Sequence, residues 1–353
     1  MAKSKLHPAE LSSICIVRLS ALGDCFLLVP MIHTLRLQFP EAKIYWVVEH
    51  HLAPLFTSLE DVELIPIKKP KSPIDYLRLR SRFSAYNFDL LIAAQASFRV
   101  NLIYPCIKAK TKLGFDKQRA RDLHQWFVDE RIAPRKEHLL DGFLGFTKHL
   151  GIENPTIGWP LEIPAEATHW AMKILGSQDW IAINPAASKL ERTPQASFYI
   201  DVIQKLIDAT NYHIVLTGGP SSEEVNLSNA IVLACQEKTI NLTGKTSLVQ
   251  LEALMSAVDI LIAPDTGAAH IATAFGTPVV GLYAVAPPEL SGPYLSQHLV
   301  INKFPEAVAN ILGKNPEGVK WGTRVHDRKA MDFFQVEEVI VKVHEAMKEL
   351  TID

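Results

Sequence analysis

The sequence predicts an α/β protein made of two successive domains, each with a parallel sheet at its centre. Apolar runs of strand length alternate with helical patterns along most of the chain, which is typical of βαβ units. A stretch rich in proline and glycine, residues 151–164, divides this alternation into two parts of similar size. The length of 353 residues also exceeds the roughly 250–300 residues that a single hydrophobic core usually organises.

The first half of the chain contains five expected strands, each a short and mainly apolar run. They are expected at Ser13–Arg18, Lys43–Glu49, Val62–Pro66, Asp89–Ala93 and Thr111–Gly114. Helices are expected at Phe26–Gln38, Ile74–Ser84, Phe98–Ile107 and Glu137–Leu150. Pro30 falls inside the first of these helices, where it either kinks the helix or marks the start of its regular part.

The same alternation returns after the proline-rich stretch. Strands are expected at Trp180–Asn184, His213–Thr217, Thr239–Leu242, Asp259–Ala263 and Pro278–Tyr283. Helices are expected at Ala196–Ala209, Ser222–Cys235, Leu248–Ala257, Ala268–Phe275 and Val336–Leu350. The pattern predicts a first domain over 1–160, a second over 161–335 and a final helical segment over 336–353. Open α/β sheets bind ligands beyond the carboxyl ends of their strands, so two such domains predict a cleft for a donor and an acceptor.

Composition and charge exclude several classes of protein. The hydrophobic content of 48% excludes a disordered or collagen-like chain. Lys plus Arg number 36 against 38 Asp plus Glu, so no basic excess indicates a nucleic-acid partner. No apolar run is long enough to span a bilayer, and the first residues lack the apolar core of a secretory signal. The four cysteines are far apart and form no CxxC pair, which favours reduced thiols in a cytoplasmic protein.

The first expected strand ends in the sequence RLSALGD, which places a carboxylate at the edge of the sheet where a ligand is expected. Gly23 allows a tight turn, and Asp24 then stands at the start of a helix. Asp24 could therefore serve as a helix cap, as a base that accepts a proton from a hydroxyl, or as both. The segment has no GxGxxG pattern, which weakens the hypothesis of an NAD-dependent dehydrogenase.

The second half carries three segments that suit a nucleotide. INPAASKLER places Ser188, Lys189 and Arg192 after a strand, where small residues, a hydroxyl and cations suit phosphate, or form a plain surface turn. In YHIVLTGGPSSEE, Ser221 or Ser222 caps a helix, and Glu223 or Glu224 could hold ribose hydroxyls or simply favour the first turn.

PDTGAAH is the sharpest of the three segments. A buried strand runs into Asp265, Thr266 and Gly267, and a helix of small residues then begins at Ala268. The first turn of such a helix offers unpaired N–H groups and the positive end of its dipole to a pyrophosphate. His270 lies on that first turn, within reach of a phosphate.

Together these segments resemble the lipopolysaccharide heptosyltransferases of glycosyltransferase family 9, over most of the chain. The motifs are VRLSALGD, FDLLIAAQASFR, NPAASK and PDTGAAHIATAFGTPVVGLY, and the pattern is most similar to the type that adds the first heptose to the anionic sugar Kdo. The resemblance implies a GT-B fold with two Rossmann-like domains facing a cleft, and a last helix that crosses back to the first domain. It also implies an inverting reaction that needs neither a metal nor another cofactor.

The resemblance also implies roles for particular residues. Asp24 matches the catalytic base. The residues that match the donor site are Ser188, Lys189, Arg192, Glu223, Thr246, Asp265, Thr266, Gly267, Ala268 and His270. Arg192 stands where the family has a lysine, so the charge is kept but the shape of the cation changes. Gln95, Arg99, Arg119 and Arg121 match the acceptor side, and Lys68, Lys69 and Lys71 form a basic cluster that could contact Kdo or lipid A, or be a solvated loop.

The implied partners are ADP-heptose and a Kdo-lipid A or inner-core acceptor, with peripheral contact to the inner membrane surface. Besides the NAD-dependent dehydrogenase, two other classes stay open. A nucleotide-sugar epimerase of the same fold would need no acceptor groove, and a lipopolysaccharide-binding protein without activity would not need Asp24. Within the family, transfer of another hexose or of a later heptose is the nearest alternative.

Overall fold

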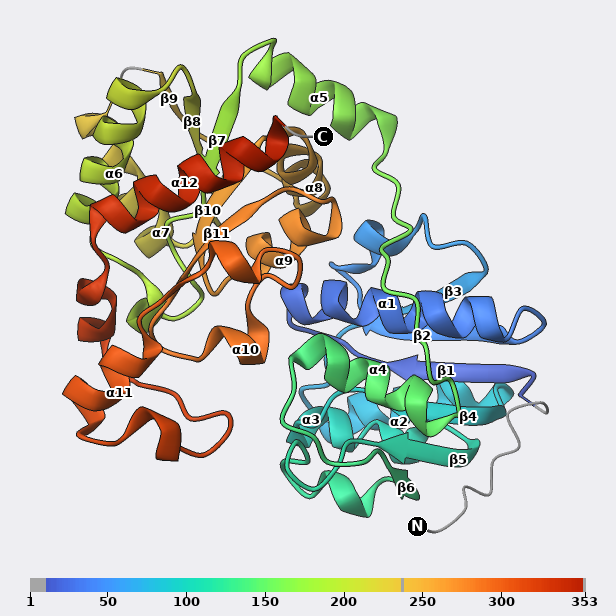
Figure 1. The fold of residues 1–353 in the computed structure, drawn as a ribbon. Helices are drawn as coiled ribbons and strands as arrows, with labels where there is room; N and C mark the ends of the chain where they lie inside the picture. Colours follow the sequence, from blue (N-terminus) through green and yellow to red (C-terminus); the bar gives the residue numbers. More distant parts are fainter. Residues whose placement is uncertain (1–10, 236–237, 352–353) are drawn as a thin grey trace. The chain divides into compact units, whose positions relative to one another are not determined.

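The computed structural model describes residues 11–235 and 238–351, and the chain divides into two units between Glu162 and Ile163 (Figure 1). Each unit contains one six-stranded sheet whose neighbouring strands are all parallel. The predicted α/β class with two parallel sheets is therefore confirmed.

In the first unit the strand order is β3-β2-β1-β4-β5-β6. The strands are β1 (Ser13–Val17), β2 (Lys43–Glu49), β3 (Val62–Ile67), β4 (Phe88–Ala93), β5 (Ala109–Gly114) and β6 (Glu130–Arg131). The helices are α1 (Leu22–Gln38), α2 (Pro73–Arg82), α3 (Phe98–Asn101) and α4 (Leu139–His149). The chain builds outward from β1 in one direction and then crosses to β4 on the other side. This reversal between β1 and β4 makes a topological switch point, the usual place for a ligand in such sheets.

Helix α1 starts earlier than the sequence predicted, so Pro30 lies in its interior and does not mark its start. A proline at this position cannot donate a backbone hydrogen bond to the carbonyl of Phe26, four residues before it. The indole Nε1 of Trp159 donates to that carbonyl at 2.7 Å and so replaces the missing bond. Thr34 Oγ1, one turn later, donates to the carbonyl of Thr156 at 2.9 Å. The proline-rich stretch is thus held along α1 by two hydrogen bonds, of which the one from Trp159 compensates for Pro30.

The second unit repeats the same order, β12-β11-β10-β7-β8-β9. Its strands are β7 (Trp180–Ile183), β8 (His213–Leu216), β9 (Thr239–Asn241), β10 (Ile260–Pro264), β11 (Val279–Tyr283) and β12 (Ile301–Asn302). Its helices are α5 (Ala165–Leu175), α6 (Ala196–Ala209), α7 (Ser222–Ala234), α8 (Leu248–Ala257), α9 (Gly267–Ala274), α10 (Pro288–Ser291), α11 (Phe304–Leu312) and α12 (Val336–Leu350). The switch point of this sheet lies between β7 and β10.

The last helix, α12, packs into the core of the second unit. Val339, Val343 and Ala346 are buried there with residues of α6 and of strands β10 and β11. The resemblance implied that this helix crosses back to the first domain, and the structure differs because its apolar face completes the second core. Helices α5, α10 and α11 and the two-residue strands β6 and β12 were not predicted at all.

Two further observations concern expectations from composition. All four cysteines are free, and Cys15, Cys25 and Cys235 are buried. Among the described residues, no helix combines the length and the apolar character needed to cross a membrane.

Candidate active site

Asp24 lies just beyond the carboxyl end of β1, at the switch point of the first sheet. It is the third residue of α1, and the N-cap position predicted for it belongs to Ala21. Its Oδ2 accepts a hydrogen bond from the backbone N–H of Ala21 at 3.2 Å, so the carboxylate closes the first turn from inside the helix. The side chain is 29% exposed, and in the described part of the chain Oδ1 has no hydrogen bond or ion pair. One oxygen is therefore occupied by the fold, while the other can accept a proton from a ligand.

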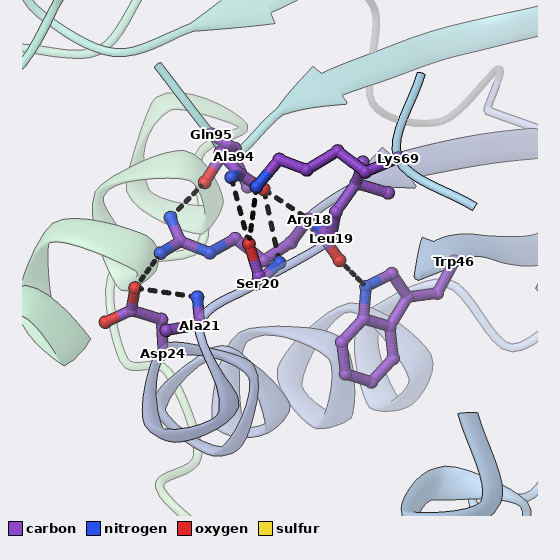
Figure 2. A network of polar contacts seen from close by, with 9 residues as sticks. All are labelled: Arg18, Leu19, Ser20, Ala21, Asp24, Trp46, Lys69, Ala94 and Gln95. Atoms are coloured by element: carbon purple, nitrogen blue, oxygen red, sulfur yellow. Dashed lines mark hydrogen bonds and ion pairs between the residues drawn. The ribbon is translucent and has the colours of Figure 1, made fainter. Parts of the chain in front are cut away.

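Arg18 holds the occupied oxygen of Asp24 (Figure 2). Its guanidinium is 9% exposed and forms an ion pair with Asp24 through Nη2, while Nη1 donates to the carbonyl of Ala94 at 2.8 Å. The guanidinium carbon also lies 5.3 Å from the centre of the Phe143 ring, within the range of a cation–π contact. The Arg18 carbonyl accepts from Trp46 Nε1 at 3.0 Å. These contacts fix the orientation of the carboxylate from both sides of the switch point.

Gln95 ties the loops after β1 and β4 together. Its Oε1 accepts from the backbone N–H groups of Leu19 at 2.8 Å and Ser20 at 3.3 Å, and its carbonyl accepts from the buried Tyr104 hydroxyl. Lys69, which follows β3, donates to Ser20 Oγ at 3.2 Å. Figure 2 shows that Gln95, Ser20 and Lys69 form one connected network with Arg18 and Asp24. The sequence-predicted Gln95 is therefore buried and shapes the site, while Lys69 reaches it from a different strand.

The other predicted acceptor residues have different surroundings. Arg99, at the start of α3, and Arg121, in the loop after β5, are exposed, as is Lys68. Arg119 is largely enclosed: Nη1 pairs with Asp116 at 2.7 Å and Nη2 with Glu137 at 2.9 Å. Arg119 therefore already has two intramolecular partners, and the structure assigns it a part in holding its own loop.

In the second unit, two loops meet at the switch point between β7 and β10. Ser188 and Lys189, in the loop after β7, are exposed. Arg192 follows in the same loop, and its Nη1 forms an ion pair with Asp265, which follows β10, at 2.8 Å. The buried Tyr283 lies beside this pair, and burial together with the Asp265 carboxylate raises its pKa well above the usual value. Residues far apart in the sequence are thus brought to one edge of the sheet.

Helix α9 begins at Gly267, two residues after Asp265. Thr266 is its N-cap residue, but the buried Thr266 Oγ1 makes no hydrogen bond. Gly267 and Ala268 form the first turn, whose N–H groups have no partner within the helix. His270, three residues after Gly267 in the same helix, is buried. The start of α9 therefore combines a hydroxyl without a hydrogen bond and N–H groups without a partner in the helix, a combination that suits a phosphate.

The two glutamates after β8 have separate environments. Glu224 folds back so that its Oε2 accepts from the Gly219 N–H at 2.6 Å. Glu223 is fully exposed, and hydrogen bonds from its own N–H and from Ser222 lower the pKa of its carboxyl. Ser221, and not Ser222, is the N-cap of α7. The structure thus leaves Glu223 available for a ligand. Thr246 is half-buried and lies just before α8, in the loop after β9.

Arg18 and Ser20 are the site residues that sequence reasoning missed. Both lie inside the quoted motif RLSALGD, and a cation six residues before a carboxylate was the available signal. Their importance depends on the neighbouring loop after β4, which only the topology brings close. Within residues 11–235 and 238–351, no group of three or more His, Cys, Asp or Glu side chains is arranged to hold a metal ion.

Comparisons with known proteins agree with this architecture. The family model described as "Glycosyltransferase family 9 (heptosyltransferase)" matches residues 76–314. The lipopolysaccharide core heptosyltransferase OpsX of Haemophilus influenzae is 32% identical over 330 residues, covering 93% of this chain and 95% of that protein. The crystal structure of a glycosyl transferase of family 9 from Veillonella parvula superposes with a TM-score of 0.76 at 21% identity, covering 96% of this chain and 97% of that one. The E. coli heptosyltransferase WaaC with ADP gives a TM-score of 0.66 at 22% identity, covering 82% and 92% of the two chains.

Proposed function

The chain belongs to glycosyltransferase family 9 and has its GT-B fold, and from that premise we propose that it moves heptose from ADP-heptose to the Kdo-containing inner core of lipopolysaccharide. One observation carries the chemical part of the proposal. The switch point of the first sheet presents a carboxylate held by Arg18, and that of the second presents a helix N-terminus beside Arg192. A base and a pyrophosphate site are the two parts that sugar transfer from a nucleotide requires.

The second unit binds the donor in this proposal. The first-turn N–H groups of α9 and the Thr266 hydroxyl bind the pyrophosphate, and Arg192 contributes a positive charge. Ser188 and Lys189 contact the phosphates from the loop after β7, and His270 supports the same turn. Glu223 holds the ribose hydroxyls, and Thr246 packs against the adenine.

The first unit binds the acceptor and activates it. Asp24 Oδ1 removes the proton from the acceptor hydroxyl as that oxygen attacks the anomeric carbon. The bond to the ADP oxygen breaks on the opposite face, so the configuration is inverted. The helix dipole and Arg192 stabilise the negative charge on the leaving ADP, a task that a divalent metal performs in other transferases. The reaction in this proposal needs no metal.

The acceptor is anionic, and several cations near the first switch point suit it. Arg99, Arg121, Lys68 and Lys69 contact the carboxylates of Kdo or the phosphates of lipid A. Because the acceptor is carried on lipid, we propose that the protein works at the cytoplasmic face of the inner membrane.

Two other reactions would use the same donor site. Transfer of another hexose or of a later heptose would use the same base and the same phosphate site. A nucleotide-sugar epimerase would bind a similar donor, but it has no use for an acceptor side with Arg99 and Arg121. An assay of ADP release with and without acceptor separates a transferase from an epimerase, because release by an epimerase would not depend on acceptor.

Calorimetry should show that ADP binds with similar affinity in magnesium and in EDTA. Thr266→Val keeps the shape of the side chain but removes the buried hydroxyl, so ADP affinity should fall about 10-fold or more, as for one hydrogen bond to a charged group. Thr273→Val is the matched control, because the Thr273 hydroxyl is satisfied by the Ala269 carbonyl at 2.8 Å in the same helix. Binding that requires the metal, or an equal loss in both variants, would count against this donor site.

Arg99→Ala and Arg121→Ala should each raise the acceptor KM about 10- to 150-fold and leave the donor KM nearly unchanged, because each removes one charge-assisted contact. The effect should shrink as salt increases, since both side chains are exposed. Arg119→Ala should behave differently, because it removes the ion-pair partner of both Asp116 and Glu137. Its free energy of unfolding should fall by about 3–5 kcal/mol. Measuring both KM values at two ionic strengths, with a denaturant curve for each variant, checks these expectations. If Arg99→Ala and Arg121→Ala changed only the donor KM, the assignment of these residues to the acceptor site would be wrong.

A further inference from the structure

Helix α2 of the first unit is almost entirely exposed. Leu79 is its only buried residue, whereas Ile74 is exposed and Leu77 is 67% exposed. Arg78, Arg80 and Arg82 lie in the second half of the same helix. Core packing therefore explains only the buried side of α2 and not its exposed aliphatic side chains and arginines. Such composition is typical of helices that lie on a membrane surface.

A second group of exposed apolar side chains lies on α3 and in the loop after β5. Phe98, at the start of α3, and Leu123, in the loop after β5, are exposed, and Trp126 in the same loop is 72% exposed. The backbone N–H of Phe98 donates to Asp122 Oδ2 at 2.9 Å, which joins α3 to that loop. The two arginines proposed for the acceptor, Arg99 and Arg121, are the neighbours of these side chains in the sequence.

The two groups are connected through α3, which forms hydrogen bonds with both α2 and the loop after β5. The hydroxyl of Tyr76 in α2 donates to the carbonyl of Arg99 in α3 at 2.9 Å, so the two helices are in contact. We call this surface the α2–α3 face. It comprises the apolar side chains Ile74, Leu77, Phe98, Leu123 and Trp126 and the cations Arg78, Arg80, Arg99 and Arg121.

The loop that presents Leu123 and Trp126 is supported from beneath. His124 is buried, with Nδ1 at 2.8 Å from Asn101 Oδ1 and Nε2 accepting from the Phe115 N–H at 3.2 Å. Burial lowers the pKa of His124 to about 4, so the ring stays neutral and keeps both contacts. The exposed side chains on either side of it are therefore displayed by a fixed loop.

The charge of the α2–α3 face is positive. Its four arginines outnumber the acidic residues of the same segments, Asp75 and Asp122. Asp75 forms an ion pair with Arg78 at 3.8 Å, and Asp122 accepts a hydrogen bond from the Phe98 N–H. Apolar side chains enter the boundary of the acyl chains, while arginines beside them bind phosphate headgroups. We propose that the α2–α3 face docks the protein on the surface of an anionic phospholipid membrane. This inference rests on the proposed function only in giving the docking a use, the capture of an acceptor carried on lipid.

Sedimentation with vesicles tests the proposal on the full-length protein. The wild-type chain should bind vesicles of phosphatidylcholine and phosphatidylglycerol, in the absence of any acceptor, far better than phosphatidylcholine alone. The double variant R78E/R80E should lower the partition coefficient about 30-fold or more, because each cation near such a surface contributes roughly a factor of five. L77N/W126N should lower it about 10-fold or more through the loss of apolar burial.

Matched controls separate docking from general changes of charge or polarity. K314E/K320E changes the net charge by the same amount at exposed positions of the second unit, and Leu233→Asn replaces an apolar side chain that is 72% exposed there. Both should bind the vesicles as the wild type does. The proposal is overturned if the wild type does not bind anionic vesicles or binds them only when acceptor lipid is present. It is also overturned if the control variants lose as much vesicle binding as the variants of the α2–α3 face.

Transfer to an acceptor without acyl chains distinguishes this proposal from the proposed function. L77N/W126N should keep wild-type kcat and KM on that soluble acceptor and lose activity only on acceptor embedded in vesicles. If the wild type lacks transferase activity on both acceptors but still binds anionic vesicles, the proposed function fails and the docking face stands. Equal loss of activity on both acceptors in the variant would instead overturn the docking role.

Discussion

Replacing Asp24 by asparagine should lower kcat about 10²-fold or more, while ADP affinity stays close to that of the wild type. The amide keeps an oxygen that can accept from the Ala21 N–H and from Arg18, so the first turn of α1 stays closed. It cannot accept a proton at physiological pH, and that is the only function it loses in the proposed mechanism. Single-turnover assays with saturating donor and acceptor measure the effect on the chemical step.

Asp75 offers a close control for this experiment. It is also the third residue of its helix, and it also accepts the backbone N–H groups that precede the helix. Asp75→Asn should therefore reproduce any effect on helix capping without reducing kcat. If Asp24→Asn were fully active with an unchanged melting temperature, capping would be the only role of Asp24 and the proposed base would have to be another group.

Arg192→Met should weaken ADP binding about 10- to 150-fold, the value of one charge-assisted contact, and raise the donor KM accordingly. Methionine keeps part of the apolar stem, so the loss reports the guanidinium. The variant also leaves the half-enclosed Asp265 without its ion pair. An unpaired carboxylate at the phosphate site adds repulsion to the lost attraction, so this should be the largest single effect on the donor side.

A double-mutant cycle separates those two contributions. Asp265→Asn alone removes the negative charge and frees Arg192, and the two residues are in direct contact, so their effects should not add. The double variant should bind ADP better than Arg192→Met alone. Arg192→Lys should recover part of the affinity, because it restores the charge without the planar guanidinium. An Arg192→Met variant with wild-type ADP affinity would exclude Arg192 from the donor site.

The fold was largely predictable because strands buried on both faces leave a strong signal. The strand Lys43–Glu49 and the helices Ala196–Ala209, Leu248–Ala257 and Val336–Leu350 have the predicted bounds. The start of α1 was missed because its first turn is closed by a side chain from inside the helix and because Pro30 suggested a break. The hydrogen bond from Trp159 that allows Pro30 in the helix comes from more than a hundred residues away and leaves no local pattern.

The candidate site was predictable in its location but not in its internal contacts. Residues such as Asp24 and Thr266 follow strands, and the sheet order brings the ends of those strands together. Which partner each side chain chooses depends on packing between loops that are distant in sequence. Arg119 illustrates this limit, since sequence motifs suggested an acceptor contact and the fold gives it Asp116 and Glu137 instead. Arg18 shows the converse, because its role depends on the Ala94 carbonyl of another strand.

The repeated strand order of the two sheets has a consequence for how such a protein can diversify. The contacts that shape each switch point, Arg18 with Asp24 and Arg192 with Asp265, are made entirely within one unit. Mutations in the loops after β3, β4 and β5 can therefore accumulate while the loops after β7 and β10 are left intact. In the proposed function, selection for a new acceptor would act on one half of the gene, and selection to keep the activated sugar would act on the other. Chimeric genes joined near Glu162 would be a natural starting material for altering one specificity at a time.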